Sequence, residues 1–287
     1  MSAPPSPRFL DPGTPPHIVT LTAMAGLSAL TMNVYLPSLP GMTEYFGADY
    51  RVMQLSVSLY LAVSALLQVV IGPLSDRFGR RPVLIWSFLF FLVASLGCAL
   101  APSATIFLVF RMLQAAVVSG MVLSRAVIRD MVPADKAASM IAYVTMGMSL
   151  VPMASPAIGG LLDARFGWQA NFWLLIGLGA LTTWLIWRDR GETAARREGG
   201  FAAQIREYPE LLTSPRFWGY TATAMFTSGA FFAYLGGAPF VGSEIFHLDP
   251  ATLGFLFGSA AFGYLFGNWA SGRFATRFGL NRLIFWG

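Results

Sequence analysis

The chain contains a series of apolar runs, each about twenty residues long, separated by short loops that carry nearly all of its charges. A run of this length matches a helix that crosses the hydrocarbon core of a bilayer. The expected helices are residues 18–36, 53–72, 83–100, 104–124, 138–162, 170–187, 217–240 and 252–271, with 283–287 as the start of another. The sequence therefore predicts an all-α membrane protein.

The composition supports this class and argues against others. Charged residues make up 11% of the chain, whereas soluble domains carry about 25%. The single cysteine, Cys98, and the two histidines have no second metal ligand at helical spacing, and no helix presents a nucleophile–base pair, so neither a metal site nor an enzyme is expected. The net charge of +5 comes from scattered arginines rather than a basic patch, so we expect no nucleic-acid partner.

The positive charges lie almost entirely on one side of the expected membrane. Of the nineteen lysines and arginines, sixteen fall in the N-terminal tail and the even-numbered loops, and two fall in the odd-numbered loops. Loops rich in lysine and arginine stay in the cytoplasm, so the N-terminus is expected there. Residues 72–82, between the second and third helices, form the basic turn, which holds three arginines and one aspartate.

Residues 188–215 are the only long charged connection and divide the chain into two parts. Residues 1–187 form a predicted N-terminal six-helix half, and residues 216–287 form an incomplete second half. A shift of 200 residues superposes Glu44 on Glu244, Asp49 on Asp249 and the basic turn on a second turn at 272–282. Two parallel copies of one unit are an architecture of secondary transporters.

The basic turn reads G-P-L-S-D-R-F-G-R-R and resembles the G-x-L-x-D-R-x-G-R-R pattern of the major facilitator superfamily. The phrases N-V-Y-L-P-S-L-P, Q-L-S-V-S-L-Y, R-M-L-Q and F-G-W-Q-A-N-F-W look like the Bcr/CflA branch of proton-driven drug exporters. The resemblance implies a major-facilitator-type bundle in the lipid bilayer of a bacterial inner membrane. It also implies export of small amphipathic substrates in exchange for protons, with the proton gradient as energy source and no cofactor.

Two other functions fit the same residues. A transporter of this fold could instead move a natural metabolite, because the drug assignment rests on resemblance. The family has twelve helices, so the chain resembles an exporter truncated after the eighth helix. It could therefore also be a non-transporting fragment that needs helices nine to twelve from elsewhere.

The resemblance gives the basic turn a conformational role. In the family, the aspartate of this turn is thought to latch the two halves together in the outward-facing state, and here that residue is Asp76. The glycines are expected to allow close backbone approach and positive φ. The residues of the expected latch are Gly72, Asp76, Arg77, Gly79, Arg80 and Arg81. The simpler alternative is that the arginines only set the topology.

Arg111 lies within the fourth helix, about 10 Å from the outer membrane surface at about 1.5 Å of rise per residue. A charge inside the bilayer costs about 2.5–3.5 kcal/mol, so its side chain should face a cavity and find partners, unless it snorkels to the headgroups. Gln114 follows one turn later on the same face. In the resembling family, the arginine of this R-x-x-Q phrase is linked to proton coupling.

Asn33 stands where the resembling family commonly has an aspartate. All fourteen acidic residues of the chain lie in the tail, the loops or the helix ends, so no carboxylate inside the membrane is evident as a proton site. Asn33 is expected either to hydrogen-bond substrate or to stabilise a contact between helices.

The fifth helix carries S-P-A-I-G-G, which resembles the antiporter motif G-P-x-x-G-G of the family. Its residues are Ser155, Pro156, Gly159 and Gly160. The pattern predicts a kinked helix with a smooth face that lets another helix pack closely, although ordinary packing gives the same pattern.

Four aromatic residues are candidates for a wall that contacts lipophilic substrates. They are Tyr35, Phe231, Phe232 and Tyr234. The alternative for each of them is a position that faces lipid.

Overall fold

The structure is a computed structural model that describes residues 9–11, 14–132, 134–189, 191–193, 209–210, 212–256 and 266. These residues are mostly helical and contain no strand. In chain order the elements are α1 (Ile18–Asn33), the 3-10 turn η1 (Leu36–Ser38), α2 (Leu39–Phe46), α3 (Tyr50–Phe78), α4 (Arg80–Ala99), α5 (Ala104–Gln114), the 3-10 turn η2 (Ala115–Val117), α6 (Val118–Met131), α7 (Ala134–Phe166), α8 (Gln169–Arg188), α10 (Pro215–Phe240) and the π turn η3 (Val241–Ile245). Residues 250–256 are also helical. The second turn at 272–282 and the start of a ninth helix lie outside the described residues.

Six segments of the described chain are long and apolar enough to cross a membrane. They are Ile18–Phe46, Tyr50–Phe78, Arg80–Ala99, Ala104–Met131, Gln169–Arg188 and Pro215–Ile245. Helix α7, with 33 residues, packs beside α1 and α8. The prediction of an all-α membrane protein is confirmed.

The prolines interrupt the first membrane segment without ending it. The sequence predicted a helix that stops at residue 36, but α1 ends at Asn33, and η1 and α2 continue the segment to Phe46. Pro37 and Pro40 each lie in the first turn of an element, where the missing N–H has no helical partner to lose. The interruption leaves carbonyl groups at the end of α1 available to other side chains.

The basic turn is shorter than its sequence suggested. Helix α3 continues through Pro73, and α4 begins at Arg80, so Gly79 alone joins the two helices. Gly79 has φ 98° and ψ 149°, a conformation that residues with a side chain rarely adopt. Gly72 lies inside α3 and has no positive φ. The expectation of positive φ is therefore confirmed for Gly79 and was wrong for Gly72.

The two predicted halves share the same corner before their second helix. Gly47 has φ 58°, and His247, its counterpart in the repeat, has φ 52°. Asp49 and Asp249 each accept a hydrogen bond from the backbone N–H two residues later, at 2.8 Å and 3.0 Å. Hydrogen bonds from the hydroxyl and N–H of Thr252 hold the pKa of Asp249 below its usual value. The internal repeat therefore extends to the backbone at this corner.

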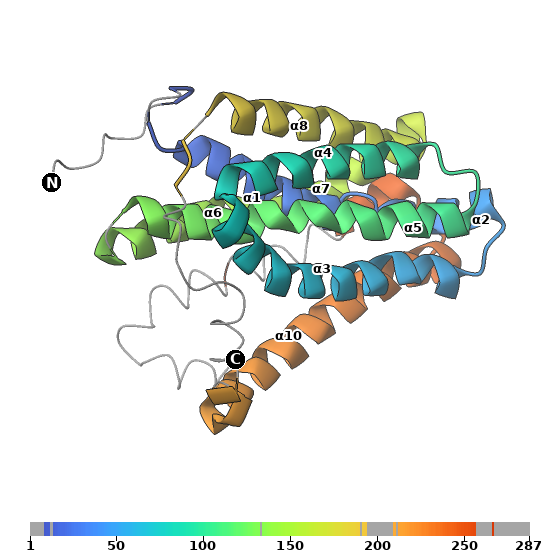
Figure 1. The fold of residues 1–287 in the computed structure, drawn as a ribbon. Helices are drawn as coiled ribbons and strands as arrows, with labels where there is room; N and C mark the ends of the chain where they lie inside the picture. Colours follow the sequence, from blue (N-terminus) through green and yellow to red (C-terminus); the bar gives the residue numbers. More distant parts are fainter. Residues whose placement is uncertain are drawn as a thin grey trace, which may run out of the picture.

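Helices α1 to α8 pack into one bundle (Figure 1). Helix α1 packs against α6, α7 and α8, and α4 packs against α5 and α8. Side chains such as Leu21, Met24 and Phe91 form its apolar core. The end of the bundle that holds Gly79 is named the turn end, and the end that holds Gly47 is named the opposite end.

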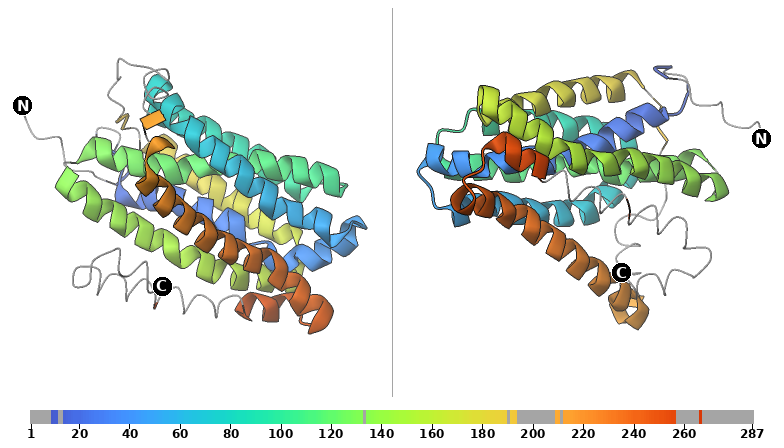
Figure 2. Two further views of the ribbon diagram at one scale, coloured as in Figure 1. Left: turned by 90° about the horizontal axis from the view of Figure 1, so that it is seen from below. Right: turned by 180° about the vertical axis from the view of Figure 1, so that it is seen from behind.

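Helix α10 meets this bundle near the opposite end, where it packs against η1, α2 and α3. Its first turns diverge from the bundle, as Figures 1 and 2 show, and most of its side chains between residues 216 and 234 are exposed. In the described part of the chain, the bundle and α10 form a V whose arms meet at the opposite end and lie apart at the turn end (Figure 1).

Candidate functional site

A charged side chain lies in the middle of the bundle. Arg111, in the last turn of α5, is 1% exposed. Its guanidinium carbon lies 4.3 Å from the ring centre of Tyr35 and 4.1 Å from that of Tyr60. Such cation–π contacts are strongest where water is excluded. Because the side chain is enclosed in this way, it does not snorkel to the headgroups.

Hydrogen bonds fix the orientation of this guanidinium. Arg111 donates to the side-chain oxygen of Gln114 and, at 3.0 Å, to the carbonyl oxygen of Thr31. Gln114 donates in turn to the hydroxyl of Ser95 at 2.8 Å, which connects α5 to α4. Arg111 and Gln114 thus meet, as their spacing predicted.

The end of α1 supplies the negative partner of Arg111. Thr31 lies in the last turn of α1, where carbonyl groups lack helical partners and carry a partial negative charge. Within the described part of the chain, no carboxylate contacts Arg111, and its Nε has no hydrogen-bond partner. The charge is therefore balanced by two ring faces and a helix end rather than by an ion pair.

Asn33 does not join this group. Its Nδ2 donates to the carbonyl oxygen of Ala29 in the same helix at 2.8 Å, and its Oδ1 has no hydrogen-bond partner among the described atoms. Sequence reasoning missed Tyr60, although Ser56, Tyr60 and Ser64 form a stripe of polar residues spaced four apart on an apolar helix. All three side chains are buried. Polar residues that recur every four positions lie on one face of a helix, so this spacing could have identified Tyr60 as part of a buried polar site.

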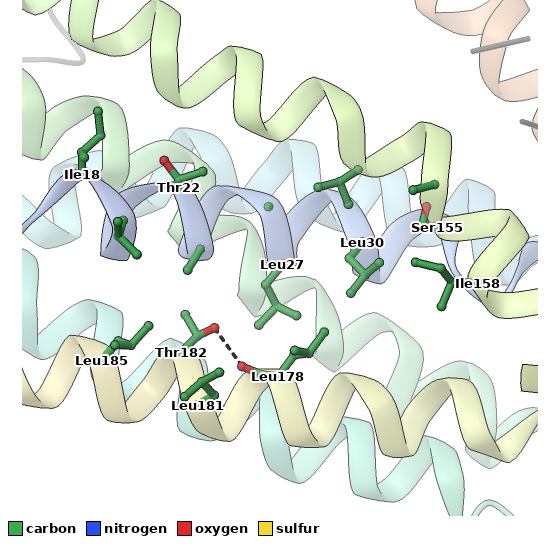
Figure 3. A pocket seen from close by; sticks show the side chains of 15 residues that line it. Ile18, Thr22, Leu27, Leu30, Ser155, Ile158, Leu178, Leu181, Thr182 and Leu185 are labelled. Atoms are coloured by element: carbon green, nitrogen blue, oxygen red, sulfur yellow. Dashed lines mark hydrogen bonds between the residues drawn. The ribbon is translucent and has the colours of Figure 1, made fainter. Parts of the chain in front are cut away.

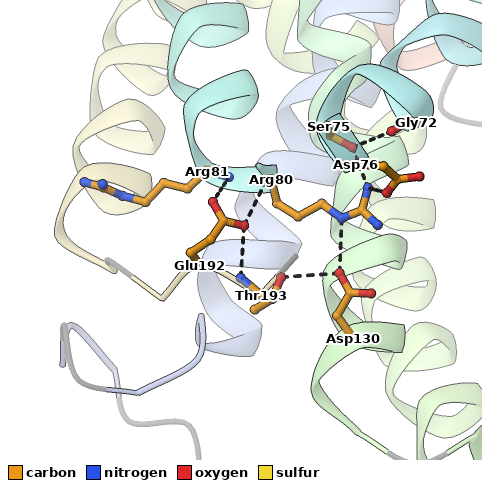
Figure 4. Close-up of polar contacts among 8 residues, drawn as sticks. All are labelled: Gly72, Ser75, Asp76, Arg80, Arg81, Asp130, Glu192 and Thr193. Carbon is orange, nitrogen blue, oxygen red and sulfur yellow. Dashed lines mark hydrogen bonds and ion pairs between the residues drawn. The ribbon is translucent and has the colours of Figure 1, made fainter. Parts of the chain in front are cut away.

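A second polar cluster surrounds Arg80 at the turn end (Figure 4). The Arg80 guanidinium lies 2.6 Å from a carboxylate oxygen of Asp76 on α3 and 3.1 Å from one of Asp130 on α6. The side chain of Arg80 is only 12% exposed, so both ion pairs are partly shielded from water. The expected latch residue Asp76 is thus paired within the bundle.

The other residues of the expected latch lie around this pair. Arg77 lies over the ring of Phe78 at 5.2 Å, and Arg81 donates to the carbonyl oxygen of Trp187 at 3.3 Å. A Cβ built on Gly72 would meet nothing within 4 Å. Gly72 is therefore an ordinary helix residue, whereas Arg80 and Arg81 connect the turn to α6 and α8.

The glycines of the expected antiporter motif lie at close backbone contacts. A Cβ built on Gly159 would overlap the end of α1, and one on Gly160 would overlap the carbonyl group of Pro250. In return, a Cβ on Gly254 would overlap the carbonyl group of Pro156. The smooth face of α7 thus lies between α1 and the helical segment 250–256.

Helices α3 and α10 also meet at the opposite end. The hydroxyl of Tyr50 donates to the carbonyl oxygen of Gly236 at 2.9 Å, and the rings of Tyr50 and Phe240 lie 4.9 Å apart. Together with the contact between Gly160 and Pro250, this pair closes the V.

The four candidate aromatic residues do not line one cavity. Tyr35 is buried inside the bundle, where its hydroxyl lies 2.9 Å from that of Ser56. Phe231 and Tyr234 are 41% and 45% exposed on α10, and Phe232 packs against the bundle. Tyr35 is therefore enclosed in the bundle, whereas Phe231 and Tyr234 lie on the exposed surface of α10.

A cavity of about 620 Å³ lies between α1, α7 and α8 (Figure 3). Its lining is aliphatic apart from a few hydroxyl groups, among them that of Ser155. Val19, Ile158 and Leu181 line it and are 43–52% exposed, so it opens at the surface of the bundle. The cavity is separate from both Arg111 and the basic turn.

Two bacterial relatives match most of this chain. It is 34% identical over 261 residues to the uncharacterized MFS-type transporter YdgK of Bacillus subtilis, which covers 88% of this chain and 65% of that protein. It is 35% identical over 229 residues to a chloramphenicol resistance protein of Pseudomonas aeruginosa, which covers 77% of this chain and 53% of that protein. The chain thus spans between about half and two thirds of these relatives.

The fold is also found in a solved transporter structure. The crystal structure of a bacterial homologue of the human lysosomal transporter Spinster superposes with a TM-score of 0.72 at 19% identity, covering 92% of this chain and 62% of that one. The family description that matches residues 21–287 is the Major Facilitator Superfamily. These related proteins are transporters rather than enzymes. The chain therefore belongs to the Major Facilitator Superfamily of membrane transporters.

Proposed function

We propose that the protein is a secondary active transporter of the Bcr/CflA type that exports small amphipathic drugs in exchange for protons. In this proposal it lies in a bacterial inner membrane with its N-terminus and basic turn in the cytoplasm. The proton gradient is its energy source. The observation that carries the proposal is the V, in which α10 touches the bundle at the opposite end and leaves it at the turn end (Figure 2).

Alternating access needs an opposite end that can open. One of the contacts there is made by glycines and backbone carbonyl groups, with Gly160 against Pro250 and Gly254 against Pro156. Such surfaces pack closely without interlocking side chains. Rocking one half against the other would separate them and close the turn end over a substrate held inside the V.

The basic turn would stabilise the alternative conformation. In the open V, Asp76 pairs with Arg80 at 2.6 Å. When the turn end closes, Asp76 would instead contact the second half. Because Asp76 would have a partner in each conformation, it shifts the equilibrium between them only by the difference in free energy between the two contacts. That difference is small enough for the latch to release.

Arg111 is assigned the role of a fixed positive charge in proton coupling. A guanidinium is not deprotonated in proteins, so Arg111 does not itself carry the proton. Its partners, Tyr35, Tyr60, Gln114 and the Thr31 carbonyl group, are neutral, so its charge is not cancelled locally. A fixed cation disfavours a second positive charge nearby, so a proton bound close to Arg111 would be released readily.

Drug export is supported by the relative from Pseudomonas aeruginosa, whose name refers to chloramphenicol resistance. Phe231 and Tyr234 offer exposed aromatic surface on α10. These observations favour lipophilic substrates over polar ones.

Transport into proteoliposomes under an imposed pH gradient tests the proposal. Chloramphenicol should accumulate in acid-loaded proteoliposomes, and a protonophore that dissipates the gradient should abolish the accumulation. Equal accumulation of chloramphenicol with and without the pH gradient would contradict proton coupling. A panel of substrates from which only polar metabolites are transported would contradict the drug assignment.

A further inference from the structure

The residues that follow α8 turn back over two other helices at the turn end. Asp189 and Glu192 each direct a carboxylate to the N-terminus of a helix that is not their own. We propose that these two residues form a clasp that fixes the N-termini of α1 and α4 and so positions the basic turn as a latch. The functional part of this inference rests on the proposed alternating access.

Asp189 caps α1 from inside the bundle. Its side chain is 3% exposed, and Oδ2 accepts hydrogen bonds from the backbone N–H of His17 and the hydroxyl of Thr20, both at 2.8 Å. His17 directly precedes α1, and the N-terminal end of a helix carries a partial positive charge. The helix therefore stabilises the buried carboxylate, which in turn holds the start of α1 against the end of α8.

Glu192 supplies a cap that α4 lacks. The helix follows Gly79, which has no side chain to accept hydrogen bonds from the first N–H groups. The carboxylate oxygens of Glu192 accept from the backbone N–H of Arg80 at 2.9 Å and of Arg81 at 3.1 Å (Figure 4). A Cβ built on Gly79 would lie 2.7 Å from Glu192 Oε2. The glycine of the basic turn therefore also makes room for the clasp.

Arg81 lies between the two caps. Its Nε and the Oδ1 of Asp189 are both buried without a hydrogen-bond partner among the described atoms. Both residues line a cavity of about 20 Å³ that also borders Thr20. A cavity of this size has room for about one water molecule, which would accept from Arg81 and donate to Asp189. Such a bridge would connect the cap of α4 to the cap of α1.

The chain between the two acids also fits tightly. A Cβ built on Gly191 would lie 2.7 Å from the carbonyl oxygen of Thr14 and 2.9 Å from the Cα of Pro15. Because glycine has no Cβ, Gly191 can pack directly against the backbone of Thr14 and Pro15, which precede α1. The three-residue spacing of the acids thus allows both caps to form at once.

The clasp acts on the basic turn through Arg80. Glu192 holds the backbone N–H of Arg80, while the side chain of Arg80 pairs with Asp76 and Asp130. Glu192 thus fixes the backbone from which the side chain of Arg80 reaches Asp76. The two acids are therefore positioning residues for the latch.

Backbone hydrogen exchange tests the clasp directly, because the first N–H groups of α4 have no partner within the helix. In the full chain in nanodiscs, Glu192→Ala should speed exchange of the Arg80 and Arg81 amides about tenfold or more, as expected for loss of a charge-assisted hydrogen bond. Glu192→Gln keeps an acceptor and should change exchange less. Glu210→Ala removes an exposed acid of the same linker and should change nothing. Exchange at the wild-type rate in Glu192→Ala would overturn the clasp.

The link between the two caps has its own readout. Asp189→Asn should speed exchange at the start of α1 and, through Arg81, also at the start of α4. An effect confined to α1 would overturn the bridge between the caps.

Transport measurements distinguish the proposed role of the clasp from that of the latch. Glu192→Ala should lower the turnover number several-fold with KM unchanged, and Glu192→Gln should restore part of it. Asp76→Asn is the reference for the latch itself. Reduced turnover in Asp76→Asn with normal turnover in Glu192→Ala would overturn the positioning role. Normal turnover in Asp76→Asn would overturn the latch instead, and hydrogen exchange would still decide whether the clasp exists.

Discussion

Arg111 is held in a way that distinguishes arginine from lysine. Its planar guanidinium lies between the rings of Tyr35 and Tyr60, while its N–H groups bond Gln114 and Thr31. A lysine ammonium is a compact, strongly hydrated charge without this planar set of donors. The site therefore selects a guanidinium and not merely a positive charge.

Arg111→Lys should lower proton-coupled transport although the charge remains. A desolvated cation–π contact is worth on the order of 2 kcal/mol, so losing one corresponds to roughly a tenfold or greater loss of rate. The measurement is the initial rate of drug transport under an imposed pH gradient, normalised to protein in the membrane. Arg51→Lys, at an exposed arginine of α3, is the control. A normal rate in Arg111→Lys would show that the aromatic setting is dispensable.

The sequence predicted the pair of Arg111 and Gln114 but not its setting. Three-residue spacing places the two on one helix face, and the structure joins them. Tyr35 and Tyr60 reach Arg111 from two different membrane segments. Periodicity indicates which face of a helix is buried, whereas the register between helices depends on the packing of all of them.

At the scale of the element, the two glycines of the basic turn differ although the sequence analysis grouped them. Gly79 has φ 98° and lies beside Glu192, whereas Gly72 is helical and has open space around it. The same substitution should therefore have opposite effects on stability at the two positions.

Gly79→Ala should lower the free energy of unfolding by about 1–3 kcal/mol, because a side chain strains this backbone and crowds Glu192. Gly72→Ala should raise it by roughly 0.5–1 kcal/mol, because alanine is the better helix former and meets no neighbour. Thermal unfolding in detergent measures both variants. Shifts of the same sign and size would contradict a turn made by Gly79 alone.

Helix ends were the hardest feature to predict. Prolines suggested boundaries, yet Pro37 and Pro40 begin elements and Pro73 lies inside α3. Membrane helices tolerate proline where neighbouring groups satisfy the freed backbone carbonyl groups. Helix starts differed as well, because the helices predicted from residues 53 and 252 begin at residues 50 and 250, directly after the capping residues Asp49 and Asp249.

At the scale of the molecule, the order and number of membrane helices in the bundle followed from the apolar runs and the loop charges. The V could not be predicted in this way, because the position of α10 depends on contacts between residues far apart in the sequence, such as those of Tyr50 with Gly236 and Phe240. Contacts between distant segments leave no periodic pattern in the sequence.

Gly160→Val should weaken the closed opposite end. The new side chain would overlap the carbonyl group of Pro250, and overpacking of this kind costs about 1–3 kcal/mol. The equilibrium should shift away from the V described here, and the initial rate of transport should fall. Gly177→Val on α8, where a Cβ meets nothing within 4 Å, is the matched control. Equal initial rates of transport in the two variants would show that this contact plays no part in the transport cycle.

The most direct test of alternating access is a pair of distances measured by electron paramagnetic resonance in the same preparation. Spin labels at Leu74 and Trp218 report on the turn end, and labels at Tyr45 and Phe246 report on the opposite end; all four side chains are exposed, and the buried Cys98 is replaced by alanine. On addition of substrate or acid, the first distance should shorten while the second lengthens. Two distances that stay constant, or that shorten together, would contradict transport by rocking of the two halves.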